Sequence, residues 1–289
     1  MTARFTSDNH PFITPDLVNA LSSKPADVHS SYGPSPPQFG ELRLPKGDGP
    51  HPVATVLHGG CWLSLYADLH NADALADALR DEGIATWNVE YRCVDQDGGG
   101  WPGTFLDAGL ATDHLRTLAA DHDLDLDRII SIGHSAGGHL ALWTAARHRL
   151  PRNSPIWNAD PLPLRGAVVL AGPGDLKRFT PHADAECRQG VVSELLGGPG
   201  VTLEELEERF RCGSPAGLLP LGVRQVLISA EHDWVVPPEL GEAYVETARN
   251  AGDDIEHQVI PDAGHHEFMV PGSVTWQAVR GAVRTLLET

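Results

Sequence analysis

The chain has 289 residues, of which 41% are hydrophobic and 21% charged, so it can build a sizeable core as one large α/β domain or two smaller ones. Its formal net charge of −18 argues against nucleic acid or an anionic membrane surface as a partner. No stretch approaches the roughly 18 apolar residues of a membrane span. The composition is therefore that of an ordinary globular protein.

The four cysteines, Cys61, Cys93, Cys187 and Cys212, show no C-x-x-C pair and no metal-ligand spacing. Four are too few for a disulfide scaffold at this length, so we expect reduced thiols. The first residues, MTARFTSDNHPF, have neither the basic nor the apolar region of a secretion signal. Together these features predict a cytoplasmic location.

Residues 1–26 are polar and predict an N-terminal arm with a helical patch at 15–22, and 27–289 predict a single α/β domain. After two short strands, at 27–32 and 39–44, strands and helices alternate. The further strands are expected at 52–57, 84–91, 129–132, 167–171, 225–229 and 255–260. The helices are expected at 67–82, 104–121, 138–147, 239–250 and 274–287. Such alternation implies a doubly wound, mainly parallel sheet with helices on both faces.

Residues 173–222 interrupt this alternation. The stretch mixes glycine, proline and charge, and contains one acidic helical piece at 202–210. It has too few apolar residues to form a core of its own. We therefore interpret it as a cap-like insertion over the site rather than as a second domain.

Two patterns suggest a metal ion without completing a metal site. The chain has 15 histidines, but H-E-x-x-H is absent. The acidic run at 121–127 resembles the start of a calcium loop, yet Leu126 and Ile132 stand where that loop needs glycine and glutamate. We interpret the run as a solvated turn before a strand, and we expect no metal and no cofactor.

The most informative motif is GHSAG at 133–137, which matches G-x-S-x-G. The apolar run at 129–132 enters it as a buried strand, and a helical stretch leaves it. A strand that runs straight into a helix needs a tight, strained turn, where Gly133 and Gly137 have no Cβ to clash. This context predicts that Ser135 is a nucleophile held at a helix N-terminus above the C-terminal edge of the sheet. A glycine-rich turn with an ordinary serine is the alternative.

A serine nucleophile needs a base to accept its proton and a group that orients the base. Asp233 follows the strand at 225–229, and His265 follows the strand at 255–260. Both therefore lie at strand ends, in the chain order Ser, Asp, His. We predict that His265 is the base and that Asp233 orients its ring.

Other residues compete for these two roles. His266 is an alternative base, but Gly264 gives the backbone freedom to aim His265. Asp175, after the strand at 167–171, is the most serious alternative acid. Two further carboxylates lie before the expected turn positions: Glu231 and Asp262.

Backbone amides are the expected oxyanion donors, because they are fixed before charge develops. The amide of Ala136, directly after the serine, is one candidate. The loop HGGCW at 58–62 offers others, foremost those of Gly60 and Cys61. Cys61 is better interpreted as a small residue that contributes its amide than as a nucleophile, since nothing nearby in the sequence would make it a thiolate.

These motifs, with EYR at 90–92, WPGTFLDA at 101–108, HDWVVP and AGHHEF, resemble the α/β-hydrolase superfamily over residues 27–289. The chain is most similar to the esterase/lipase branch that includes kynurenine-formamidase-like and feruloyl- or acetylxylan-esterase-like enzymes. HGG followed by Cys-Trp, where hormone-sensitive-lipase relatives have HGGG, favours the formamidase-like side. The resemblance implies a triad and an oxyanion hole: Ser135, Asp233 and His265, with Gly60, Cys61 and Ala136.

The residues and the resemblance together imply a serine hydrolase that cleaves small carboxylic esters through an acyl-enzyme intermediate, without metal or cofactor. The alternatives are an arylformamidase acting on N-formylkynurenine and a binding module without turnover. We expect a small-molecule ester or amide as partner, with no nucleic acid and no membrane, and a homodimer is left open. Three tryptophans adjoin the motif loops and are candidates for a substrate pocket, with core packing equally open: Trp62, Trp101 and Trp234.

Overall fold

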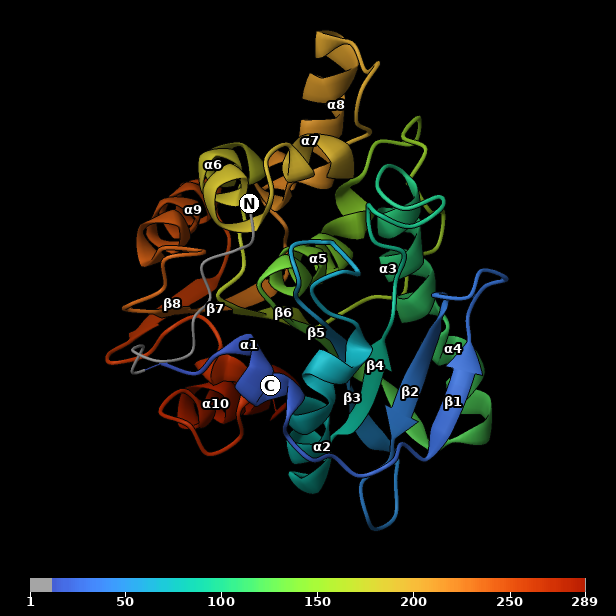
Figure 1. The fold of residues 1–289 in the computed structure, drawn as a ribbon. Coiled ribbons are helices and arrows are strands. Elements are labelled where there is room, and N and C mark those ends of the chain that lie inside the picture. The colour runs from blue at the N-terminus through green and yellow to red at the C-terminus, as the bar shows by residue number, and fades with distance from the viewer. Residues whose placement is uncertain (1–11, 289) are drawn as a thin grey trace.

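The computed structural model describes residues 12–288. Its centre is an eight-stranded sheet in the order β1-β2-β4-β3-β5-β6-β7-β8 (Figure 1). At one edge β1 (Val28–Ser31) and β2 (Phe39–Arg43) pair antiparallel, and the strands from β3 to β8 run parallel. Their bounds are β3 (His51–Leu57), β4 (Ala85–Val89), β5 (Leu124–His134), β6 (Gly166–Leu170), β7 (Arg224–Ala230) and β8 (Ile255–Ile260). The predicted doubly wound, mainly parallel sheet is confirmed.

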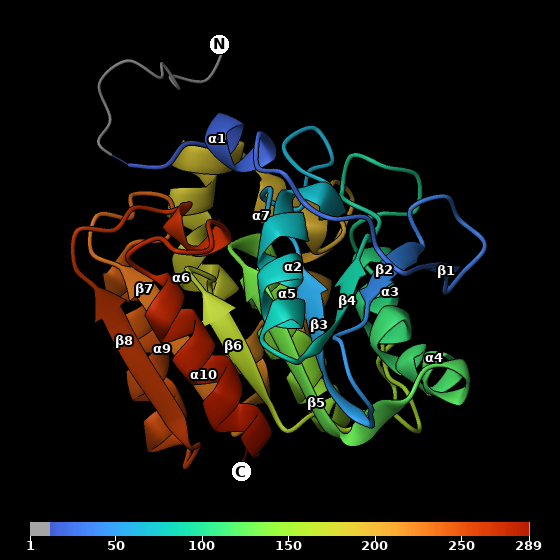
Figure 2. The same ribbon diagram turned by 90° about the horizontal axis from the view of Figure 1, so that it is seen from below.

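Helices cover both faces of this sheet, and each face has its own apolar core (Figure 2). One face packs against α2 (Asp73–Asp81) and α10 (Trp276–Glu288). The other packs against α3 (Gly103–Asp113), α4 (Leu115–Asp121), α5 (Ala136–Ala146) and α9 (Pro238–Asn250). Every residue of α5 is buried, as expected of a helix between the sheet and outer helices. Within residues 12–288, no helix is long and apolar enough to cross a membrane.

Several expected elements differ from those in the structure. The helix expected at 67–82 is a 3-10 turn, η1 (Leu69–Ala72), followed by α2, and the helix expected at 104–121 is divided at His114 into α3 and α4. The acidic run is not only a turn, because Leu124 already pairs with His51 of β3 ahead of a register shift. The charge of Asp125 is compensated by Arg128, whose Nε lies 2.6 Å from its carboxylate. Alternating acids can therefore begin a strand when a partner strand and a cation are available.

The N-terminal arm packs along the domain from residue 12 onward, through the short helix α1 (Pro15–Asn19). The backbone amide of Lys24 donates to Asp77 of α2, and the amide of Ile13 donates to Glu267. The prediction for residues 1–11 lies outside the described residues. The arm thus contacts both α2 and η5 (Glu267–Met269).

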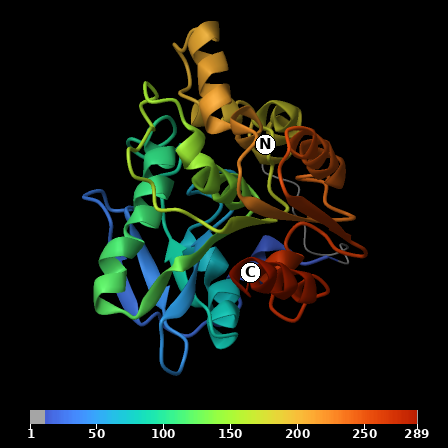
Figure 3. The same ribbon diagram turned by 180° about the vertical axis from the view of Figure 1, so that it is seen from behind.

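The insertion stands above the sheet as a group of short helices, with α8 projecting furthest (Figures 1 and 3). Its elements are α6 (Leu176–His182), the π-helical turn η3 (Ala183–Cys187), α7 (Val191–Leu195), α8 (Leu203–Gly213) and η4 (Pro215–Leu218). Its two ends meet where the amide of Ala216 donates to the carbonyl of Gly174 at 2.9 Å. Trp143 of α5 donates through Nε1 to the carbonyl of Cys212. The base of the insertion is therefore fixed to the core.

Gly137→Ala should destabilise the protein by at least about 3 kcal/mol, because α5 meets the end of β3 without room for a methyl group. A Cβ on Gly137 would lie 2.0 Å from the carbonyl oxygen of Leu57 and 2.4 Å from that of His58. Urea unfolding measures the change. The matched control is Gly281→Ala, on an exposed turn of α10 where a Cβ meets nothing within 4 Å. That control should gain about 0.5–1 kcal/mol, and equal effects of the two substitutions would contradict the packing described here.

Candidate active site

Ser135 occupies the turn between β5, which ends at His134, and α5, which begins at Ala136. Its backbone has φ 53° and ψ −119°, a conformation that residues with a side chain rarely adopt. The turn is held because the amide of Ser135 donates to the carbonyl of Leu170 at 2.9 Å. A Cβ on Gly133 would lie 2.1 Å from the carbonyl of Gly137. The strained strand-turn-helix that the motif predicts is therefore present, with the two glycines where only glycine fits.

Asp233 and His265 meet at the neighbouring strand ends. The Nδ1 atom of His265 lies 2.7 Å from Oδ2 of Asp233, and both side chains are buried. The other carboxylate oxygen, Oδ1, accepts the amides of Val235 and Val236 at 2.8 and 2.9 Å. Three donors thus hold the carboxylate. Because a carboxylate can only accept, the ring of His265 carries its proton on Nδ1 and donates it to Asp233 in a hydrogen bond. This leaves Nε2 of His265 free to act on another group.

The alternative acids lie elsewhere. Asp175 is the N-cap of α6, where its side chain accepts the amides of Lys177 and Arg178. Glu231 and Asp262 are exposed, and Glu231 accepts the backbone amide of Asp262. Among the described residues that were candidates for the acid, Asp233 alone bonds to the ring of His265.

His134 links the serine turn to the loop of His265. Its Nε2 donates to the carbonyl of His265 at 2.8 Å, and the two ring centroids are 4.6 Å apart. Within the described residues, no hydrogen bond joins Ser135 Oγ to His265. Such contacts are often loose without substrate and tighten in the reacting complex. His134 therefore couples the backbone of the candidate base to the residue next to the candidate nucleophile.

The rings around His265 are neutral at physiological pH. Burial, helped by the neighbouring histidines, holds the pKa of His134 well below its usual range. Burial also lowers the pKa of His266 to about 3. Both neighbouring rings therefore stay uncharged near neutral pH, and His266 is a poor proton acceptor. The packing thus favours His265 over His266 as the base.

The HGGCW loop passes directly beside the serine. A Cβ on Gly59 would lie 3.3 Å from the Cβ of Ser135. The next three residues, 60–62, have φ values of 96°, 54° and 57°. Within residues 12–288, the amides of Gly60 and Cys61 donate no hydrogen bond, and the amide of Ala136 lies in the first turn of α5, where helices lack internal acceptors. The three predicted donors are therefore unengaged.

A buried network that no sequence motif predicts holds this loop from the side of β4. His58 Nε2 lies 3.1 Å from Oε1 of Glu90, and the hydroxyl of Tyr91 donates to the carbonyl of His58 at 2.8 Å. Burial by itself would raise the pKa of Glu90, but His58 and the amides of Leu69 and Tyr91 lower it overall. Only the EYR similarity pointed to this segment, because the contact joins positions far apart in sequence.

The expectation of four reduced cysteines is wrong for two of them. Cys61 and Cys187 form a disulfide with their Cα atoms 5.9 Å apart. Cys93 and Cys212 are free and buried, as expected of small apolar residues. Cys61 and Cys187 are separated by 126 positions, so no spacing rule could have revealed the disulfide. The disulfide joins the HGGCW loop to the insertion.

The three tryptophans lie in different surroundings. Trp62 is fully buried and packs edge-on against His139 and Phe179. Trp101 is half-buried and packs against Phe105, with the guanidinium of Arg209 5.7 Å from its ring centroid. Trp234 is partly buried and adjoins Asp233 in sequence. Trp62 has the surroundings of a core residue, and a role of any of the three in substrate binding stays a prediction.

His139→Gln should reduce the acid sensitivity of folding. Burial lowers the pKa of His139 to about 4 from 6.5, so the folded state keeps the ring neutral. Below pH 6.5 the unfolded chain takes up the proton first, and stability is lost as the pH falls toward 4. Linkage makes this loss about 3 kcal/mol. Urea unfolding at pH 7.5 and 4 should show the wild type losing more than the variant by that amount, and equal losses would contradict a neutral buried ring.

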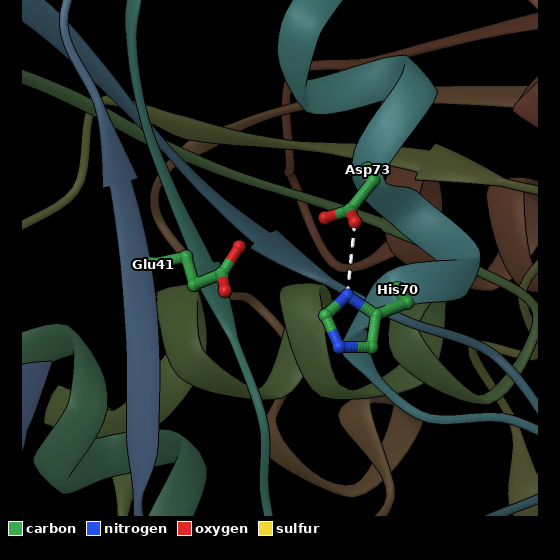
Figure 4. Close-up of side chains that lie close together, drawn as sticks. All are labelled: Glu41, His70 and Asp73. Carbon is green, nitrogen blue, oxygen red and sulfur yellow. Dashed lines mark hydrogen bonds and ion pairs between the residues drawn. The ribbon is translucent and has the colours of Figure 1, made fainter. Parts of the chain in front are cut away.

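Two groups of potential metal ligands occur within residues 12–288. In the first, His70 Nδ1 lies 2.9 Å from Asp73 Oδ2, and Glu41 faces them (Figure 4). The buried guanidinium of Arg43 donates to both carboxylates, at 3.1 and 2.7 Å. Since Arg43 already supplies the compensating positive charge, this group is explained as an ion-pair network. The second group is exposed on loops: Glu231, His232 and Asp262.

The sheet order, with a strained serine turn after the fifth strand, defines an α/β-hydrolase. The fold matches the crystal structure of esterase B from Lactobacillus rhamnosis with a TM-score of 0.77 and 16% identity, over 94% of this chain and 89% of that one. The BD-FAE family matches residues 41–246. The chain belongs to this family of α/β-hydrolase esterases.

Two curated relatives are named as esterases, and both are longer than the part that matches this chain. Esterase LipC of Mycobacterium tuberculosis is 26% identical over 92% of this chain and 66% of its own length. "Probable isoprenylcysteine alpha-carbonyl methylesterase ICMEL1" of Arabidopsis thaliana is 24% identical over 76% of this chain and 47% of its own length. The chain thus spans about half to two thirds of the length of these relatives.

Proposed function

We propose that the protein is a serine carboxylesterase that cleaves small esters through an acyl-enzyme intermediate. The observation that carries the proposal is the 2.7 Å contact between Asp233 and His265, whose carbonyl is bonded to His134, next to a serine in a strained strand-to-helix turn. Membership of an esterase family supports it independently. A binding module would have no need to maintain the buried Asp-His pair and the strained serine together.

In the proposed reaction Ser135 Oγ attacks the ester carbonyl while Nε2 of His265 takes up its proton. Asp233 keeps Nδ1 protonated and stabilises the imidazolium that forms. His265 then gives the proton to the leaving alcohol, and the acyl group stays on Ser135. Water, activated by the same ring, attacks the acyl-enzyme and releases the acid. These reaction steps need no metal and no cofactor.

The oxyanion of the tetrahedral intermediate would be bound by the amides of Gly60, Cys61 and Ala136. Those of Gly60 and Cys61 donate no hydrogen bond within the described chain, so binding the oxyanion costs no existing contact. Such donors are most effective when they are fixed in advance. The hydrogen bond from Leu63 to the carbonyl of Gly60 closes the turn that carries Cys61, and the bond from Ser135 to the carbonyl of Leu170 holds the turn before Ala136.

The burial of the serine supports a substrate with a small acyl group. The names of the relatives support an ester as the bond that is cleaved. Ser135 and His265 are only 4% and 3% exposed. LipC is named an esterase and the Arabidopsis protein a methylesterase. The alternative of formamide hydrolysis has no support among these relatives. We therefore place short-chain esters of small alcohols or phenols first among substrates.

The test is a panel of p-nitrophenyl esters of increasing acyl length, run beside N-formylkynurenine. We expect kcat/KM to be highest for acetate or propionate and to exceed that for N-formylkynurenine. A preference for the formamide would overturn the ester assignment while leaving the triad in place. Absence of turnover with every substrate, together with no labelling by a fluorophosphonate, would overturn the proposed enzyme.

A further inference from the structure

The disulfide ends on the loop that carries the proposed oxyanion donors. Cys61 lies between Gly60 and Trp62, in the left-handed region at φ 54°. A residue with a side chain is held there only when its surroundings impose it. The neighbours of Cys61 are held by other bonds: Leu63 donates to the carbonyl of Gly60, and Val94 to that of Trp62, each at 2.8 Å.

Cys61 is, with Trp62, a central residue of the turn that the hydrogen bond from Leu63 to Gly60 closes. Within residues 12–288 its amide and carbonyl take part in no hydrogen bond, and its bonded partner is the sulfur of Cys187. Its amide is therefore free to face a ligand, while its side chain ties the turn to another element. The disulfide is the covalent bond that holds this turn against the insertion.

The other end of the disulfide is firmly placed. Cys187 ends the turn η3, whose first residue, Ala183, is fully buried. Its carbonyl accepts the hydroxyl of Tyr66 at 3.1 Å, and the following amide, of Arg188, donates to the carbonyl of Ala183. Cys187 is thus an anchor that the insertion holds against the HGGCW loop.

We propose that Cys187 is a positioning residue for ester hydrolysis: its disulfide holds the amide of Cys61 in the oxyanion hole, so that turnover depends on the oxidation state of this pair. The inference rests on the proposed function. When the S–S bond is reduced, each sulfur gains a proton and one of two electrons supplied by the reductant. Cys61 can then leave the left-handed region, and its amide turns away from the site.

The expected signature is a loss of kcat that is uniform across esters. Oxyanion donors act on the transition state, so KM should change little. Removal of a whole donor costs about 10²–10³-fold, and a displaced donor should cost roughly tenfold or more. A disulfide that only restrained the insertion would instead alter the preference for acyl length.

The experiment compares oxidised wild-type protein with protein reduced by a water-soluble phosphine, which takes up oxygen from water to become the phosphine oxide. The phosphine is removed before assay, and thiol labelling counts the reduced pair. We expect kcat to fall at least about tenfold for acetate, butyrate and hexanoate esters alike, and to return on reoxidation. Cys187→Ser should have the kcat of the phosphine-treated wild type before any treatment, and the phosphine should not change it further.

Tyr66→Phe is the matched control, because it removes the other side-chain contact to Cys187 and leaves the disulfide intact. It should keep the activity of the wild type and its sensitivity to the phosphine. Unchanged kcat after complete reduction, or a loss confined to one acyl length, would overturn the positioning role. Either result leaves the esterase proposal intact, whereas an oxidised protein without turnover would refute the esterase proposal itself.

Discussion

Ser135→Ala should lower kcat for p-nitrophenyl acetate by at least about 10⁴-fold. The alanine cannot attack the carbonyl, and the Asp233–His265 pair alone can only assist water. Because the side chain is small and its turn is set by the backbone, the variant should unfold at the same urea concentration as the wild type. Steady-state kinetics with the purified variant measure the change.

The matched control is Ser131→Ala, on β5, the strand that leads into the turn of Ser135. The hydroxyl of Ser131 is buried and donates to the carbonyl of Ala141, so it has a structural partner. This control should lose some stability and keep its kcat within a few-fold. Near wild-type turnover in the Ser135 variant would mean that another residue is the nucleophile.

Asp233→Asn should lower kcat by about 10⁴-fold, with little change in KM. Asparagine fits the same space, but its oxygen would stay on the amides of Val235 and Val236, which turns its uncharged NH2 donor toward Nδ1 of His265. The ring would then favour the tautomer with the proton on Nε2, where it cannot receive the proton of Ser135. The Asp233 side chain is fully buried, so no solvent replaces the lost charge.

Asp175→Asn tests the competing acid with the same chemical change. Asp175 caps α6 through an acceptor oxygen that asparagine retains, so activity and stability should hold. If Asp175→Asn gave the larger loss of kcat, the observed contact between Asp233 and His265 would not be the working one.

The features of the fold and site that could be predicted from sequence depend on local patterns. The serine turn could be foreseen because β5, the glycines and α5 adjoin one another in the chain. The parallel sheet followed from strands and helices that alternate. Asp233 and His265 could be placed because parallel strands bring their C-terminal ends to one edge.

The parts that could not be predicted depend on tertiary contacts. The disulfide joins Cys61 to a residue 126 positions away, and its formation requires the insertion to fold back over the HGGCW loop. The contact of His58 with Glu90 bridges the ends of β3 and β4, which become neighbours only in the sheet. The helix expected at 104–121 is divided at His114, a residue type that does not mark a break as proline or glycine would.

The disulfide also bears on where the protein works. Disulfides persist in oxidising surroundings and are rare in reducing ones. The predicted cytoplasmic location rests on reduced cysteines and on the lack of a secretion signal. The Cys61–Cys187 bond removes the first of these grounds, and the location stays a prediction.

The central claim is that Ser135 carries the acyl group during turnover. Mixing the protein with excess p-nitrophenyl acetate, quenching in acid and mapping the acetylated peptide by mass spectrometry tests it directly. We expect one acetyl group per chain, on Ser135, that disappears as substrate is exhausted. Acetylation at another residue during turnover, or turnover with no acylated species on Ser135 in a rapid-quench series, would contradict it.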